Sequence, residues 1–399
     1  MLFGKLCLER KENVFISKSS KKLVALVDIG RAFWYEQTGR PEKGGFFLYL
    51  SPDDKNLMKK QEKKMKTLLS GIKPTGRPHL GNYLGMLKPG LELASHSDYH
   101  SFLFIADYHA LNFVQDQKLM RELVLEVALT YLALGLDPAQ TYFYRQSDIP
   151  EIFELALILQ CVCPKGFMNR AHAYKAVVDK NKAEGRDEDD GVNMGLFNYP
   201  VLMAADILMF NADYVPVGQD QVQHLEYTRD LAIKFNHVFG KTFKIPEALV
   251  KDEVAVLPGL DGRKMSKSYG NTIPLFEPDN KIKKIINSIK TDCKGANEPK
   301  ETDGNLIYLI YKELASAEET AAFAEAFRSG ISYGEAKQKL YEKFIEYFSG
   351  PRAIYEDLKA HPDTVFDILA EGQKKVRPIA QEGIQIIRSK IGINRSGRD

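Results

Sequence analysis

The residues between Lys73 and Asn82 have types and spacing that suit phosphate chemistry. An apolar pair, Leu68 and Leu69, precedes them and predicts a short buried strand, which the prolines and glycines of the stretch then break. From Leu80 onward, leucines recur every three or four residues and predict a helix. A helix that starts directly after a strand offers unpaired backbone N–H groups and the positive end of its dipole, and both favour a bound phosphate.

Two polar side chains at the start of this helix, His79 and Asn82, are three residues apart and share one face. Gly81 lacks a Cβ, so a flat ring can rest against the backbone there. Strand–turn–helix junctions with glycines are common in α/β proteins. Taken alone, this stretch is explained equally well as an ordinary junction.

A second stretch, Arg263-Lys264-Met265-Ser266-Lys267-Ser268, places two lysines three residues apart with hydroxyl side chains beside them. Glycines at positions 259, 262 and 270 flank it and predict a mobile loop. Lysine is a flexible point charge, which suits phosphates that move during a reaction. Taken singly, lysines in a surface loop are ordinarily only solvated.

In this order, the two stretches resemble the paired signatures of class I aminoacyl-tRNA synthetases. His79-Leu80-Gly81-Asn82 resembles the HIGH tetrapeptide, with leucine for the isoleucine and asparagine for the last histidine, and Lys264-Met265-Ser266-Lys267-Ser268 matches the KMSKS loop without a change. A third block, Tyr199-Pro200-Val201-Leu202-Met203-Ala204-Ala205-Asp206-Ile207-Leu208 followed by Asp213 to Gln221, resembles the tryptophan-specific members of the class more closely than the tyrosine-specific ones.

Asp206 is the only charged residue in an apolar run, Val201 to Met209, that predicts a helix. A carboxylate in such a helix is costly unless it has a partner, and a structural hydrogen bond is the simplest interpretation. The resemblance implies a second role, because the matching aspartate in that family accepts the indole N–H of tryptophan. An acceptor-only carboxylate suits a donor-only indole N–H, and a substrate without that donor would be rejected. Where many bacterial relatives have phenylalanine, this chain has Leu69, so the wall that stacks on the indole is expected elsewhere.

The resemblance implies a two-step reaction in which ATP and L-tryptophan give tryptophanyl-adenylate, and the 3′ end of tRNA(Trp) then takes the aminoacyl group. It assigns catalysis to His79, Asn82, Lys264 and Lys267. It assigns ATP binding to the signature residues and to residues after the later strands: Lys73, Pro74, Thr75, Gly81, Asn82, Gly218, Gln219, Asp220, Val256, Lys264, Met265, Ser266, Lys267 and Ser268. Tryptophan binding falls to Asp206, Met203, Tyr199, His109 and Gln221. Mg²⁺ is expected with ATP, without a carboxylate cage of its own.

Composition sets wider limits. The 399 residues carry a net charge of only +2, so a basic surface for tRNA must be local. No apolar run approaches the ~20 residues that span a bilayer. Of four cysteines, only Cys161 and Cys163 are close, which predicts neither a zinc site nor a disulfide framework and fits the cytoplasm. A homodimer is expected from the resemblance alone.

We expect an α/β fold: a doubly wound, parallel, Rossmann-like domain over residues 65–275, with an insertion at about 149–198, then a helical region over 276–399. The resemblance implies that the helical region is an anticodon-binding domain; the simpler interpretation is a helical bundle that only covers the catalytic core. Residues 1–64 hold 14 lysines and arginines against 8 acidic residues. We expect them to be a poorly ordered extension or a non-native start, with an RNA-binding arm as the alternative; strands are possible at Leu23–Val27 and Gly45–Leu50.

Three rival functions fit parts of the pattern. A tyrosine--tRNA ligase is possible because an aspartate also accepts a phenol O–H. A nucleotidyltransferase that makes a metabolite could carry both signatures, but the long helical tail argues against it. A regulatory paralogue without turnover is disfavoured because His79, Lys264 and Lys267 are all present.

Overall fold

The computed structural model describes residues 14–16, 23–28, 31–36, 65–250 and 257–393, and the chain divides into two compact units, Met1–Lys64 and Met65–Asp399. In the first unit, strands β1 (Val14–Ile16), β2 (Leu23–Asp28) and β3 (Arg31–Glu36) form an antiparallel sheet in the order β1-β2-β3. The strand expected at Leu23–Val27 is β2, whereas β1 and β3 were not expected from the sequence pattern. The possible strand at Gly45–Leu50 lies outside the described residues.

The second unit is built on a five-stranded sheet with the order β6-β5-β4-β7-β8, in which every pair is parallel. Its strands are β4 (Lys66–Ile72), β5 (Tyr99–Ile105), β6 (Thr141–Arg145), β7 (Tyr214–Val217) and β8 (Glu247–Val250). The chain leaves β4 toward β5 on one side and returns to β7 on the other. This reversal confirms the doubly wound sheet, and it places the ends of β4 and β7 beside each other.

Helices connect these strands. The helix after β4 comprises α2 (Leu80–Asn82), a single widened turn η1 (Tyr83–Leu87) and α3 (Lys88–Ala94). The others before β7 are α4 (Asp107–Ala110), α5 (Gln117–Ala133), η2 (Gln146–Asp148), α6 (Glu151–Val162), α7 (Lys165–Met168), α8 (His172–Ala183) and α9 (Met194–Met209). After β7 come η3 (Gln219–Gln221) and α10 (Val222–Phe239). The charged stretch Asp179–Asp190 was expected to be a loop, but helix α8 extends into it and ends at Ala183.

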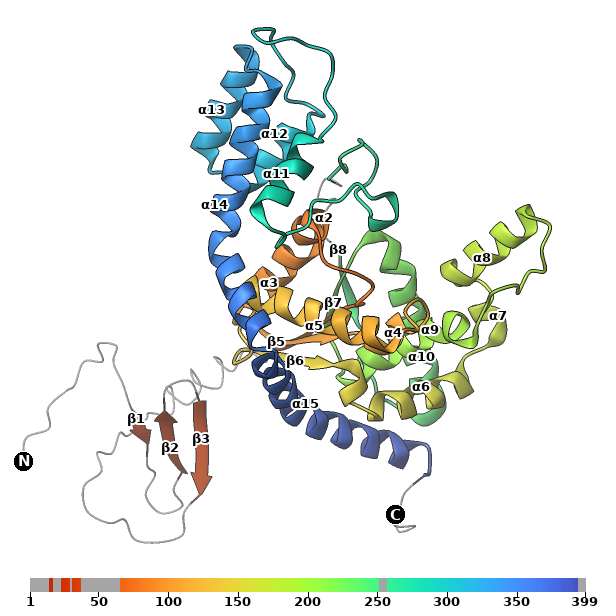
Figure 1. Cartoon of the computed structure of the whole chain (residues 1–399). Helices are drawn as coiled ribbons and strands as arrows, with labels where there is room; N and C mark the ends of the chain where they lie inside the picture. Colours follow the sequence, from red (N-terminus) through yellow and green to blue (C-terminus); the bar gives the residue numbers. More distant parts are fainter. Residues whose placement is uncertain (1–13, 17–22, 29–30, 37–64, 251–256, 394–399) are drawn as a thin grey trace, which may run out of the picture. The chain divides into compact units, whose positions relative to one another are not determined.

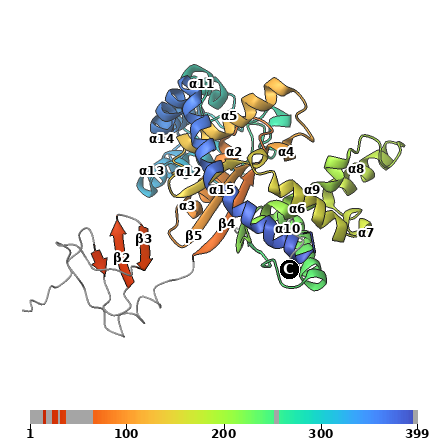
Figure 2. The same cartoon turned by 90° about the horizontal axis from the view of Figure 1, so that it is seen from below.

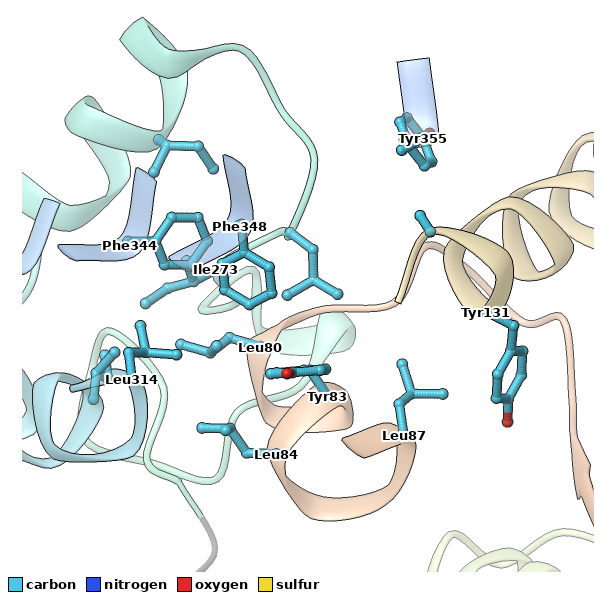
Figure 3. Close-up of a cluster of buried hydrophobic side chains, with 14 of the residues drawn as sticks. Leu80, Tyr83, Leu84, Leu87, Tyr131, Ile273, Leu314, Phe344, Phe348 and Tyr355 are labelled. Carbon is cyan, nitrogen blue, oxygen red and sulfur yellow. The ribbon is translucent and has the colours of Figure 1, made fainter. Parts of the chain in front are cut away.

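Alternation along β5 divides the interior into two apolar clusters, because successive strand side chains point to opposite faces. Leu103 and Ile105 belong to the cluster with the helix after β4, α5 and the C-terminal helices, whereas Phe102 and Phe104 belong to the cluster with α6, α9 and α10. Figure 3 shows part of the first cluster, where Phe348 lies beside Tyr83 with ring centroids 5.2 Å apart.

The C-terminal region is helical, as expected: η4 (Lys267–Tyr269), α11 (Asp279–Asn287), α12 (Leu306–Leu314), α13 (Ala317–Arg328), α14 (Tyr333–Ala360) and α15 (Pro362–Lys390). Where the sequence suggested separate helices at Tyr333–Phe348 and Ala353–Leu358, α14 is one helix with Pro351 inside it. Helices α11, α12 and α13 gather around one end of α14 (Figure 1).

The last helix, α15, runs across the five-stranded sheet (Figure 2) and packs on its edge strand β6, and not only on other helices. Its close approach depends on Gly372, because a Cβ there would lie 1.7 Å from the carbonyl oxygen of Phe143 in β6. Lys375 donates a hydrogen bond from Nζ to the carbonyl of Pro138 at 3.2 Å, and Arg388 forms an ion pair with Glu154 of α6. Residues 65–399 are accordingly one compact unit, and a domain boundary at 275 stays a prediction.

Candidate active site

The turn after β4 has the capped geometry of a helix start. His79 accepts a hydrogen bond at Nδ1 from the backbone N–H of Asn82 at 3.3 Å, and Asn82 Oδ1 accepts from the backbone N–H of His79 at 3.2 Å. Asparagine at position 82 therefore closes a capping box on the histidine. Burial, together with the nearby Lys267 charge, lowers the pKa of His79 to about 4, so its imidazole is neutral near pH 7.

The lysine-rich segment reaches this turn, although nearly 190 residues separate the two in sequence. A Cβ built on Gly76 would lie 2.9 Å from Lys267 Nζ, and one built on Gly81 would lie 3.2 Å from Met265 Sδ. The backbone N–H of Leu80 donates to the carbonyl of Ile273 at 2.8 Å. These glycines leave room for the second signature to pack directly on the first.

Asn271, which the sequence analysis did not single out, holds the lysine-rich segment in shape. Its side chain accepts from the backbone N–H of Ser266 at 2.8 Å and donates to the carbonyl of Lys264 at 3.1 Å and to Asp261 at 2.7 Å. The residue is 3% exposed. Its position directly after Gly270 was the available signal, because a polar side chain beside a left-handed glycine often closes a turn.

A second group connects the signature turn to the C-terminal helices. Glu126 of α5 accepts hydrogen bonds from the Tyr355 hydroxyl of α14 at 3.0 and 2.9 Å and lies 3.7 Å from Arg77. Burial lowers the pKa of Lys267, and the Glu126 charge opposes that shift. One carboxylate on α5 thus lies within electrostatic reach of the signature lysine and also binds α14.

A cavity of about 390 Å³ opens beside the turn that follows β4, and Lys73 of that turn lines it. Of the residues expected to bind tryptophan, His109, Tyr199 and Gln221 line it. The remaining lining residues come from α4, α8, α9 and α10 and their neighbours: Asn112, Phe113, His172, Ala173, Ala176, Leu196 and His224. Leu69 is 2% exposed in the core and is not among the lining residues, so the rings that face the cavity are those of His109, Phe113, His172, Tyr199 and His224.

Asp206 lies one layer behind this cavity, 1% exposed, and it is not without partners. His109 Nε2 lies 3.0 Å from Oδ2, and Gln146 Nε2 donates to Oδ1 and Oδ2 at 2.9 and 3.0 Å. Burial raises the pKa of Asp206, and both hydrogen bonds oppose the rise. Met203 is half-buried on α9 but does not line the cavity.

The residues expected on the nucleoside side follow β7, next to the end of β4. Gly218 and Gln219 are exposed, and the backbone at 219–221 forms the short turn η3. Thr75 is exposed in the signature turn and Pro74 is buried. Val256 lies outside the described residues. Within the described ranges, no three His, Cys, Asp or Glu side chains gather in a way that could hold a metal ion.

These features recur in known proteins. A family model described as "tRNA synthetases class I (W and Y)" matches residues 60–349. The chain belongs to this family. Among its relatives, the tryptophan--tRNA ligase of Pseudomonas aeruginosa is 51% identical over 82% of this chain and 73% of the relative's length. The tryptophan--tRNA ligase of Neisseria meningitidis is 48% identical over 82% of this chain and 98% of the relative's length. The tryptophanyl-tRNA synthetase of Campylobacter jejuni, solved with ADP and tryptophan, superposes with a TM-score of 0.75 at 42% identity, covering 82% of this chain and 99% of that one.

The comparisons confirm the expected fold, the enzyme class and, at the level of the family, the tryptophan--tRNA ligase function. A tyrosyl-tRNA synthetase from Archaeoglobus fulgidus shares the fold at 19% identity, which shows a common fold and nothing about the amino acid. In the part of the chain that the structure describes, no helix is both long and apolar enough to cross a membrane.

Proposed function

We propose that this cavity activates L-tryptophan with ATP and that the product is passed to the 3′ end of tRNA(Trp). The observation that carries the proposal is that the two signature segments contact each other and that the first of them, through Lys73, borders a cavity backed by a buried carboxylate. A nucleotidyltransferase that makes a metabolite would need the two signature segments, but it would not need a buried carboxylate behind an aromatic-lined cavity.

In the first step the tryptophan carboxylate attacks the α-phosphorus of ATP, and pyrophosphate leaves. No side chain becomes a nucleophile, so the protein contributes positioning and charge stabilisation. The Lys73, Lys264 and Lys267 ammonium groups would hold the phosphates. The backbone N–H groups of Leu80 and Asn82 already donate to Ile273 and His79, so they do not serve this purpose. Neutral His79 offers hydrogen bonding without adding a second fixed charge next to Lys267.

The magnesium ion enters with ATP as part of the substrate, because Mg²⁺ commonly keeps its waters and binds substrate phosphates. Gly218, Gln219 and Asp220 would hold the ribose and adenine side at the end of β7, as expected where a doubly wound sheet reverses. Homodimer assembly, the cytoplasm as location, and anticodon binding by the C-terminal helices stay predictions.

Tryptophan would be recognised by Asp206 through its indole N–H. A carboxylate has about four lone-pair positions, and the contacts to His109 and Gln146 use at most three of them. Five rings around the cavity supply the stacking surface that Leu69 does not.

ATP–pyrophosphate exchange with each of the twenty amino acids tests the proposal. We expect exchange with tryptophan alone, and loss of selectivity in Asp206→Ala with the protein still folded. Exchange driven equally by tyrosine, or an Asp206→Ala protein that does not fold, would contradict the assignment.

A further inference from the structure

Asp107 lies just beyond the point where strands β5 and β6 stop pairing. The register of β5 and β6 ends with Ile105 opposite Arg145, so backbone hydrogen bonds no longer hold the two segments together beyond that pair. Asp107 continues the connection: its Oδ1 accepts from the backbone N–H of Ser147 at 3.0 Å, and its Oδ2 accepts from the Ser147 hydroxyl at 2.5 Å. A carboxylate that receives two hydrogen bonds from one residue holds that residue in position and orientation.

The two segments joined in this way carry both of the hydrogen-bond partners of Asp206. His109 lies two residues after Asp107 in α4, and Gln146 lies one residue before Ser147 in η2. Gln146 is fully buried, yet its Oε1 accepts no hydrogen bond from the described residues. Among the described residues, the side-chain amide of Gln146 is therefore hydrogen-bonded only to Asp206.

We infer that Asp107 is a positioning residue for tryptophan selectivity: through Ser147 it fixes the turn that aims Gln146 and His109 at Asp206. The inference rests on the proposed role of Asp206 as acceptor of the indole N–H. Without this clamp between Asp107 and Ser147, the Gln146 amide and the His109 imidazole can shift away from Asp206. Asp206 then loses the contacts that fix its orientation, and a misoriented acceptor no longer distinguishes a substrate with an N–H from one without it.

The test measures discrimination rather than activity. Pyrophosphate exchange is measured for tryptophan and for its benzothiophene analogue, in which sulfur replaces the indole N–H and the shape is nearly kept. The ratio of the two kcat/KM values reports recognition of the N–H alone. We expect Asp107→Ala to lower this ratio by about tenfold, the size of one hydrogen bond to a charged group. Asp107→Asn, which retains an acceptor for the Ser147 N–H, should recover part of it.

Asp137→Asn is the matched control, because Asp137 also accepts one backbone and one side-chain hydrogen bond, from the Ala139 N–H and from Gln140 Nε2, both at 2.8 Å, but it lies before β6 and outside the turn that carries Gln146. We expect its ratio to equal that of the unmodified protein. Should Asp107→Ala fail to fold, Ser147→Ala removes one of the two hydrogen bonds and must lower the ratio by a smaller factor.

Asp206→Ala, which removes the acceptor altogether, separates the two proposals. If it leaves the ratio unchanged, Asp206 does not read the N–H and the proposed recognition is wrong. If Asp206→Ala abolishes discrimination while the Asp107 and Ser147 variants lose activity equally toward both substrates, the clamp is merely structural and the inference is overturned.

Discussion

Replacing Lys267 by alanine separates catalysis from binding and from stability. Its ammonium group lies over the turn that would hold the ATP phosphates, with Nζ 2.9 Å from where a Cβ of Gly76 would be. There it can follow the charge that develops as pyrophosphate leaves, and such a preorganised charged donor is typically worth a factor of about 10²–10³ in kcat. The cavity lining does not include Lys267, so the KM for tryptophan should change little.

Stability should not fall in this variant, because burial already lowers the pKa of Lys267 and the folded protein thus disfavours its charge. Pyrophosphate exchange over a range of tryptophan concentrations, together with thermal unfolding, measures all three quantities. Lys312→Ala, at an exposed lysine on α12, is the control for the loss of one positive charge and should behave like the unmodified protein. A parallel loss in kcat and in tryptophan affinity, or a clear fall in Tm, would refute the assignment.

Three other predictions concern stability. The pKa of His79 is about 4 in the folded protein and its ordinary value is 6.5, so protonation favours unfolding as the pH falls from about 6.5 toward 4. Urea unfolding should therefore show about 2 kcal/mol less stability at pH 5 than at pH 7, and a smaller loss in His79→Asn. Tyr355→Phe removes the hydroxyl that Glu126 accepts and should cost about 1–3 kcal/mol; an unchanged unfolding curve would mean that the bond contributes nothing. Gly372→Ala should lower Tm sharply because its Cβ meets the backbone of β6 at 1.7 Å, whereas Gly350→Ala, with open space around it in α14, should raise Tm slightly.

Elements with a clear local pattern could be predicted from the sequence. The apolar residues at Thr141–Arg145 predict a strand and those at Leu306–Leu314 predict a helix, and β6 and α12 have these bounds. The meeting of the two signatures is implied only by the resemblance to the family, because the lysine-rich segment does not directly follow a strand.

Contacts between distant parts of the chain could not be predicted in this way. The hydrogen bonds to Asp206 come from residues 97 and 60 positions away, and periodicity says nothing about which buried amide or imidazole will meet a carboxylate. The position of α15 on β6 depends on Gly372, which in the sequence is only a small residue inside a helix. The apolar pattern indicated two helices, Tyr333–Phe348 and Ala353–Leu358, whereas α14 continues through Pro351, because a proline inside a long helix can be tolerated when packing on both sides holds the helix together.

The internal hydrogen bonds of Asp206 favour its proposed role. A fully buried carboxylate with no donors would have its pKa raised by burial and would tend to hold a proton. A protonated acid presents an O–H donor toward the cavity, and such a donor cannot accept an indole N–H. The Gln146 amide donates to Asp206 and the His109 ring lies at hydrogen-bond distance from it; both contacts oppose the rise in pKa and so favour the acceptor form, although burial is the larger effect. The discrimination between tryptophan and a substrate without an N–H then depends on two residues that need not touch the indole nitrogen, and on the clamp that keeps both in place.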